Sequence, residues 1–93
     1  MNNSVADILS KLENADNVSK NKLENELVNF GGTAVPELVR NLSIVTGKVR
    51  GVVAMTLIRI GAPSIEFLKK AAADNNDLKW IADYLITEIN AAA

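Results

Sequence analysis

The sequence contains no cysteine and no histidine. Without cysteine, the chain cannot form a disulfide, a zinc–thiolate site or a cysteine nucleophile. The lack of histidine removes the commonest metal ligand and the commonest general base. Aromatic residues make up only 4% of the chain, and its formal net charge is -1, a balance that argues against a strongly basic nucleic-acid-binding surface. From these absences we predict a protein that is not an enzyme and that has no metal site and no cofactor.

The composition is that of a globular protein. Hydrophobic residues make up 48% of the 93 residues and charged residues 23%, which are ordinary values for a folded domain. The length leaves room for one domain, residues 1–93. The most apolar run, residues 52–58, is far shorter than the roughly 20 residues of a membrane span, and residues 1–15 show no signal-peptide pattern. We therefore expect a soluble cytoplasmic protein without membrane contact.

A pattern of apolar residues and glycine repeats along the chain. Residues 27–38 can be laid on residues 57–68, so that Gly31 falls on Gly61. The same spacing extends backward to the start of the chain and forward to its end, which is the signature of a repeat architecture. The repeat units predicted from this pattern are residues 4–31, 32–61 and 62–91.

Each unit contains two helical patterns, because apolar residues recur at three, four and seven positions along one face. Ser4 begins a capping-box sequence, and Thr33 is a candidate cap for the third helix. Gly31 and Gly61 predict helix ends, while Pro63 fits the first position of a helix. The six predicted helices span about residues 4–14, 18–30, 33–44, 48–60, 63–73 and 77–90.

Stacking of the units would give the chain its core. A single helical hairpin cannot bury its apolar face, whereas about three stacked hairpins bury a continuous one. The middle unit would be covered on both sides, and residues 49–60 are accordingly rich in Val, Leu and Ile. The equivalent helix of the first unit carries Lys20, Lys22 and Glu24 instead, as a polar end unit would. The expected fold class is therefore all-α.

The second unit is the most regular copy of the repeat. The residues that carry the pattern are Val49, Arg50, Val53, Ala54, Leu57, Ile60 and Gly61 of this unit, followed by Ala62, Pro63, Ile65 and Leu68 of the next. This pattern resembles the HEAT-like repeat, especially the short type found in phycobilisome lyases and many bacterial proteins. The resemblance covers nearly the whole chain, although Asn21, Lys22 and Glu24 depart from it. It implies a right-handed α-solenoid of three helical hairpins, an α-α superhelix whose second helices line the concave face.

The expected concave face carries two aromatic residues. Trp80 and Tyr84 are four residues apart and so share a helical face, and their equivalents in the second unit are Gly51 and Met55. Because aromatic residues are enriched in binding hot spots, we predict a scaffold or adaptor that binds a protein or peptide here. The alternative is that Trp80 lies across Gly51 and Tyr84 shields the end of the stack. The predicted partner-binding residues are Gly51, Met55, Arg59, Trp80, Asp83 and Tyr84.

Three basic residues, Lys20, Arg50 and Lys79, occupy equivalent positions in the three units. The resemblance implies that such a column forms an internal ladder with acids of the neighbouring turns, for which Asp16 and Asp77 are the candidates. A second interpretation is a weak nucleic-acid binder that uses the column as phosphate contacts. A third, by likeness to the lyases, is a non-catalytic subunit of a lyase-type complex.

A stack of three units has two open ends. We expect the C-terminal end to expose Ile81, Tyr84 and Leu85, beside a core stripe made of other residues of the same helix. Exposed apolar ends favour association, and an end-to-end homodimer would cover this one. The predicted core stripe of the last helix consists of Leu78, Ala82, Ile86 and Ile89.

Overall fold

A computed structural model describes residues 4–92 of the chain. Within these residues all regular structure is helical, which confirms the predicted all-α class, and each predicted helix has a counterpart. None of the described helices combines the length and apolar character that crossing a membrane requires. The elements are α1 (Val5–Leu12), α2 (Asn17–Asn29), the 3-10 helix η1 (Gly31–Ala34), α3 (Val35–Asn41), α4 (Gly47–Ile60), α5 (Pro63–Asp74) and α6 (Asn76–Ala92).

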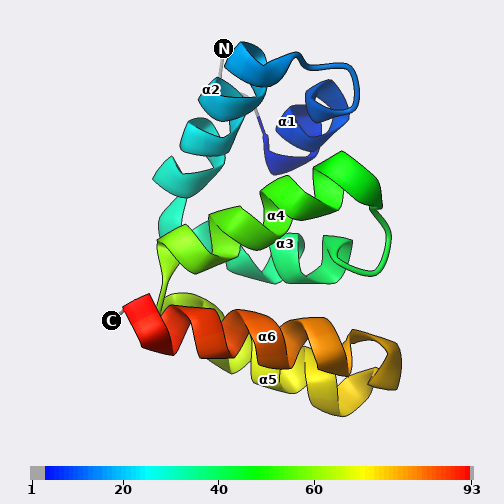
Figure 1. Cartoon of the computed structure of the whole chain (residues 1–93), viewed down its shortest axis with the longest axis vertical. Helices are drawn as coiled ribbons and strands as arrows, with labels where there is room; N and C mark the ends of the chain where they lie inside the picture. The colour runs from blue at the N-terminus through cyan, green and yellow to red at the C-terminus, as the bar shows by residue number, and fades with distance from the viewer. Residues whose placement is uncertain (1–3, 93) are drawn as a thin grey trace.

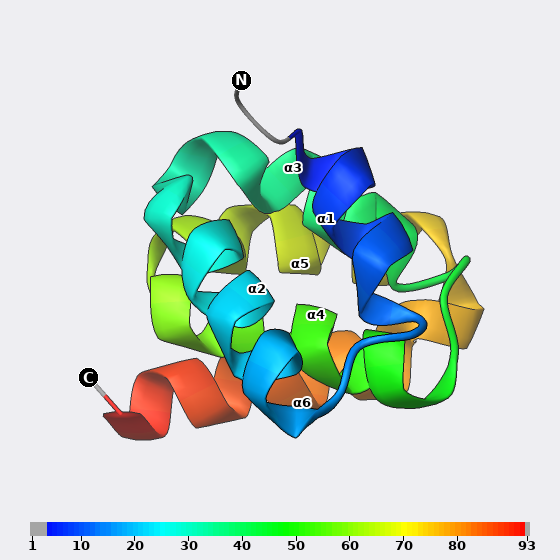
Figure 2. The same cartoon turned by 90° about the horizontal axis from the view of Figure 1, so that it is seen from above.

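Consecutive helices pack in pairs, α1 with α2, α3 with α4 and α5 with α6 (Figure 1). Seen from above, α1, α3 and α5 lie on one side of the molecule, and α2, α4 and α6 lie on the other (Figure 2). In the second set, α4 contacts both α2 and α6. The helices α4 and α6 run side by side in the same direction, whereas α2 is inclined to them (Figure 1). The central helix of the molecule is therefore α4.

Local signals in the sequence set several helix ends. The Ser4 hydroxyl accepts a hydrogen bond from the Asp7 amide at 3.1 Å, and the Asp7 carboxylate accepts one from the Ser4 amide at 3.3 Å. The predicted capping box is thus confirmed. Gly61 ends α4 with φ +84° and ψ -136°. Residues other than glycine rarely adopt this backbone conformation. Pro63 is the first residue of α5, as predicted.

The connection from α2 to α3 differs from the prediction. Thr33 does not cap α3, because the short helix η1 precedes α3 and the cap position falls on Ala34. The Thr33 hydroxyl instead donates to the Phe30 carbonyl at 2.7 Å. Gly31, with φ +62°, allows the chain to turn between α2 and η1. The sequence prediction placed a helix start here but missed the extra 3-10 turn.

The N-terminus of α2 is capped by Asp16, whose carboxylate accepts a hydrogen bond from the Ser19 amide at 2.8 Å. This bond holds the pKa of Asp16 below its ordinary value of 3.8. A carboxylate with a lowered pKa stabilises the folded state above its ordinary pKa, and this contribution disappears as the pH falls through the lower folded value. The cap is therefore an acid-sensitive element of the fold.

We expect Asp16→Ala to lower the melting temperature at neutral pH, since the variant leaves a helix-terminal amide without its acceptor. The difference from the unsubstituted protein should begin to shrink below pH 3.8, where Asp16 of the unfolded chain takes up a proton, and should be lost as the pH falls through the lower pKa of the folded state. Thermal unfolding followed by circular dichroism at several pH values tests this. Asp16→Asn is the matched control, because its side-chain oxygen still accepts at all pH values. A gap that stays constant on acidification would contradict the prediction.

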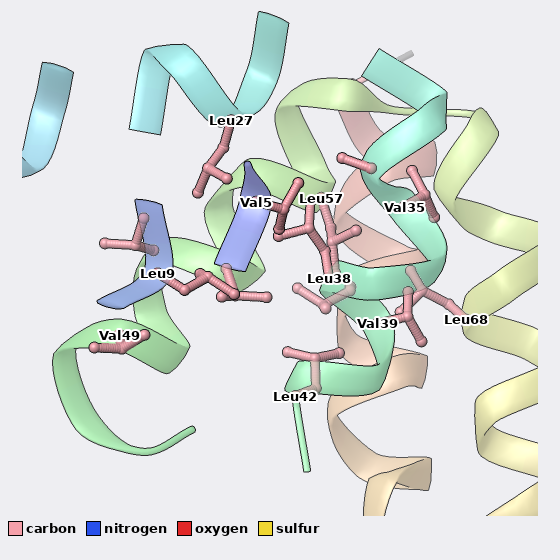
Figure 3. Packing of buried hydrophobic residues seen from close by; sticks show 14 of the residues in the cluster. Val5, Leu9, Leu27, Val35, Leu38, Val39, Leu42, Val49, Leu57 and Leu68 are labelled. Carbon is pink, nitrogen blue, oxygen red and sulfur yellow. The ribbon is translucent and has the colours of Figure 1, made fainter. Parts of the chain in front are cut away.

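One hydrophobic cluster holds the helices together, and it draws on all six. Figure 3 shows Val5 of α1, Leu38 of α3 and Leu57 of α4 pointing into a common space. Leu38 and Leu57 are both fully buried. Because each buried leucine contributes roughly 1.5–3 kcal/mol relative to the exposed side chain, this cluster is the main source of stability. The completely inaccessible aliphatic side chains are Leu12, Leu27, Val35, Leu38, Val53, Leu57, Leu68 and Leu85.

Two polar side chains, Thr56 and Ser64, are also fully buried. The Thr56 hydroxyl donates to the Val52 carbonyl at 2.7 Å, within α4. The Ser64 hydroxyl donates to the Leu57 carbonyl at 3.0 Å and so joins the start of α5 to α4. Burying a hydroxyl without a partner is costly, and these bonds remove that cost.

The last helix buries more of its surface than predicted. Ile81 is 7% exposed and Leu85 is fully buried, so the prediction that both lie at an open end is wrong. The reason is that α6 contacts α4 as well as α5, and two neighbours require a wider apolar stripe than one. Ile86, predicted to be core, is only partly buried. Ile81 and Leu85, two of the three side chains on which the expected end-to-end homodimer was based, are therefore buried in the core of the protein.

Candidate functional site

Large apolar side chains are exposed on the outer side of α4 and α6. The exposed fraction is 48% for Met55, 65% for Trp80 and 55% for Tyr84. Each lies on the side of its helix opposite the buried stripe, and the two helices are in contact (Figure 1). Gly51 is exposed on the same side of α4. We call the surface formed by Gly51, Met55, Trp80 and Tyr84 the α4–α6 face.

The structure argues against the alternative in which Trp80 seals the stack. A Cβ atom added to Gly51 would meet no other side chain and no backbone of another element within 4 Å. Trp80 therefore does not lie across Gly51. Tyr84 also keeps more than half of its surface exposed. Both aromatic side chains are therefore largely exposed to solvent.

Arg59, predicted as a partner contact, already has partners within the chain. Its guanidinium donates to the Glu24 carboxylate at 2.8 Å and to the Asn25 amide oxygen at 2.9 Å. Both acceptors are on α2, so Arg59 joins α2 to α4. The ion pair is partly exposed, and pairs of this kind contribute about 0–1 kcal/mol. The sequence prediction missed this link.

Between residues 4 and 92, the described ion pairs do not include the internal ladder that the resemblance implies for the basic column. Lys79 forms an ion pair with Asp83, four residues along α6, at 2.9 Å, rather than with Asp77. Asp16 is used as a helix cap. Side chains four residues apart on a helix are adjacent, which explains why Lys79 pairs with Asp83. Asp83, a predicted partner residue, is thus exposed but paired.

Arg50 borders a hollow next to the α4–α6 face. The hollow has a volume of about 230 Å³ and lies between the turn after α3 and the first turn of α6. Ser43 and Asn75 contribute polar groups, and Asp77 and Trp80 line it from α6. The Nε of Arg50 donates to the Val45 carbonyl at 3.2 Å. Trp80 therefore connects the exposed apolar face to a small polar hollow.

Comparison with protein-family models, with curated proteins and with solved structures gives no match for this chain. The likeness to HEAT-like repeats accordingly rests on the sequence pattern, most clearly on residues 49–68.

The acidic side chains of the described residues are not gathered into a metal-binding group. Across residues 4–92, no group of three or more acidic side chains is placed to hold a metal ion. Every buried side-chain nitrogen or oxygen in that range has a hydrogen-bond partner. The α4–α6 face itself presents apolar side chains, with Arg50 as a nearby charged group.

Proposed function

We propose that this chain is a small scaffold or adaptor that binds a protein or peptide partner on the α4–α6 face. In this proposal the three hairpins form a right-handed HEAT-like solenoid with repeats at 4–31, 32–61 and 62–91, and α2, α4 and α6 line its concave side. The pairing of consecutive helices and the position of α2, α4 and α6 on one side of the molecule support it.

The exposure of Trp80, Tyr84 and Met55 on two contacting helices is the observation that carries the proposal. Single exposed apolar residues are normal on protein surfaces. A group of them that includes two aromatic rings indicates an interaction surface, because each ring can bury roughly 150–250 Å² against a partner. The α4–α6 face has this character.

A peptide library selected on the immobilised protein tests the proposal. Trp80 is the only tryptophan of the chain, so its fluorescence reports directly on this face. Binding of a selected peptide should move the ring out of water and shift its emission to shorter wavelengths. Selected peptides that leave the Trp80 emission unchanged would contradict binding at the α4–α6 face.

Replacing Trp80 and Tyr84 together by alanine should weaken the binding of selected peptides by about a hundredfold, the loss of two moderate hot-spot residues. Titration calorimetry measures the affinity, and circular dichroism should show unchanged helicity because both side chains are largely exposed. The matched control is the Val18→Ala, Ile44→Ala pair, which removes exposed apolar side chains elsewhere. Equal affinity loss in both pairs, or unfolding of the first, would reject Trp80 and Tyr84 as anchors.

A further inference from the structure

Arg50 is a half-buried cation with unused hydrogen-bonding capacity. Among residues 4–92, the bond from Nε to the Val45 carbonyl is the one described for its side chain, and it takes part in neither of the described ion pairs. A guanidinium has five N–H donors, so its terminal nitrogens keep most of their capacity. The bond to Val45 holds the group at the hollow rather than leaving it to move freely in solvent.

The hollow gives these nitrogens a defined setting. Trp80 lines it together with Arg50, and the hydroxyl of Ser43 and the carboxylate of Asp77 are nearby. Asp77 makes no ion pair with Arg50, so the guanidinium is not neutralised from within. A planar guanidinium matches the geometry of a carboxylate and can donate two parallel hydrogen bonds to it.

We propose that this hollow is a carboxylate-binding subsite, in which Arg50 holds a carboxylate of the partner while Trp80 covers the adjoining apolar group. The inference rests on the proposed function, since it names the chemistry of a partner at the α4–α6 face. The carboxylate is either the C-terminus of a peptide or the side chain of a glutamate or aspartate. An apolar group next to that carboxylate lies within reach of the Trp80 ring.

The number of charges favours a single carboxylate over a nucleic acid. Asp77 repels any anion that enters the hollow, and the one guanidinium of Arg50 offsets a single negative charge rather than a chain of phosphates. Nucleic-acid affinity comes from many such contacts together. A peptide carries N–H donors beside its carboxylate, and Asp77 can accept from them. Asp77 therefore complements a peptide and opposes a polyanion.

Four blocked dipeptides test the subsite, with Trp80 fluorescence and backbone NMR shifts as readouts. Acetyl-Leu-Leu with a free C-terminus is compared with its C-terminal amide, and acetyl-Leu-Glu-amide with acetyl-Leu-Gln-amide. Each carboxylate form should bind at least about tenfold more tightly than its neutral counterpart, the effect of a charge-assisted pair. The arm that shows the larger preference tells whether a terminus or a side chain is recognised.

Arg50→Gln should remove the preference for the carboxylate, and Arg50→Lys should restore part of it. Lys79→Gln is the matched control, because it removes an equal charge beside Trp80 without touching the hollow. Equal binding of the carboxylate and the amide by the unsubstituted protein would overturn the subsite. This comparison tests the subsite even if the Arg50 variants fail to fold. Loss of the preference in Lys79→Gln to the same extent would also overturn it.

The subsite and the proposed function can fail separately. If library peptides bind at Trp80 without any preference for a carboxylate, the proposed function stands and the subsite falls. If the dipeptide carboxylates bind through Arg50 but none of the longer library peptides binds, the subsite stands and the proposed function falls. Binding of single-stranded oligothymidylate through Arg50 in place of the carboxylates would overturn the assignment of a peptide ligand.

Discussion

Replacing Leu57 with alanine is expected to lower the free energy of unfolding by about 2–5 kcal/mol. Leu57 is fully buried on α4, the helix that contacts both α2 and α6. Its side chain points into the space shared with α1 and α3 (Figure 3). The cavity left by alanine would therefore weaken the packing of α4 against α1 and α3. For a domain of this size the loss is a large part of a total stability of roughly 5–15 kcal/mol.

Urea unfolding followed by circular dichroism measures this effect. Met55→Ala is the matched control, because Met55 lies on the same helix but is 48% exposed. Its expected change is about 0.5 kcal/mol or less, as for other surface substitutions. Equal destabilisation by the two substitutions would show that α4 does not bury the face that contains Leu57.

Replacing Leu85 with aspartate should unfold most of the protein. Leu85 is fully buried on α6, which packs against both α4 and α5, so an aspartate at this position would lose its hydration. The cost of such a substitution exceeds about 4 kcal/mol, which approaches the whole stability of a small domain. Far-ultraviolet circular dichroism at neutral pH should show the loss of helix directly.

Tyr84→Asp, one residue earlier, is the control for this substitution. Tyr84 is 55% exposed, so an aspartate there remains in solvent and the protein should stay folded. The pair separates the buried side of α6 from its exposed side with the same introduced residue. If Leu85→Asp folded normally while Tyr84→Asp unfolded, α6 would be turned the other way about its axis.

The positions of the helices could be predicted because their signals are local. The Ser4 capping box involves residues only three apart, and Gly61 and Pro63 act on the backbone of their own turn. The apolar periodicity that marks a helix is likewise read within a few turns. Thr33 shows where such reasoning fails, since one extra turn of 3-10 helix moved the cap to Ala34.

The candidate site was predicted in part. The outward position of Trp80, Tyr84 and Met55 follows from their place opposite the apolar stripes of their own helices. The partners of Arg59 could not be found this way, because Glu24 and Asn25 lie 35 and 34 residues away along the chain. The hollow at Arg50 also needed the structure, since it combines residues from the turn after α3 and from the start of α6.

The sequence by itself determined that this protein is all-helical, where each helix begins and ends to within a few residues, and which side of α4 is apolar. These properties depend on backbone conformation and on side-chain spacing within single helices. Only the tertiary structure decided that Ile81 and Leu85 are buried, that Arg59 binds α2 and that Arg50 and Trp80 line the same hollow. Burial and pairing depend on which helices meet, and the free energy of those contacts is shared between residues far apart in the chain.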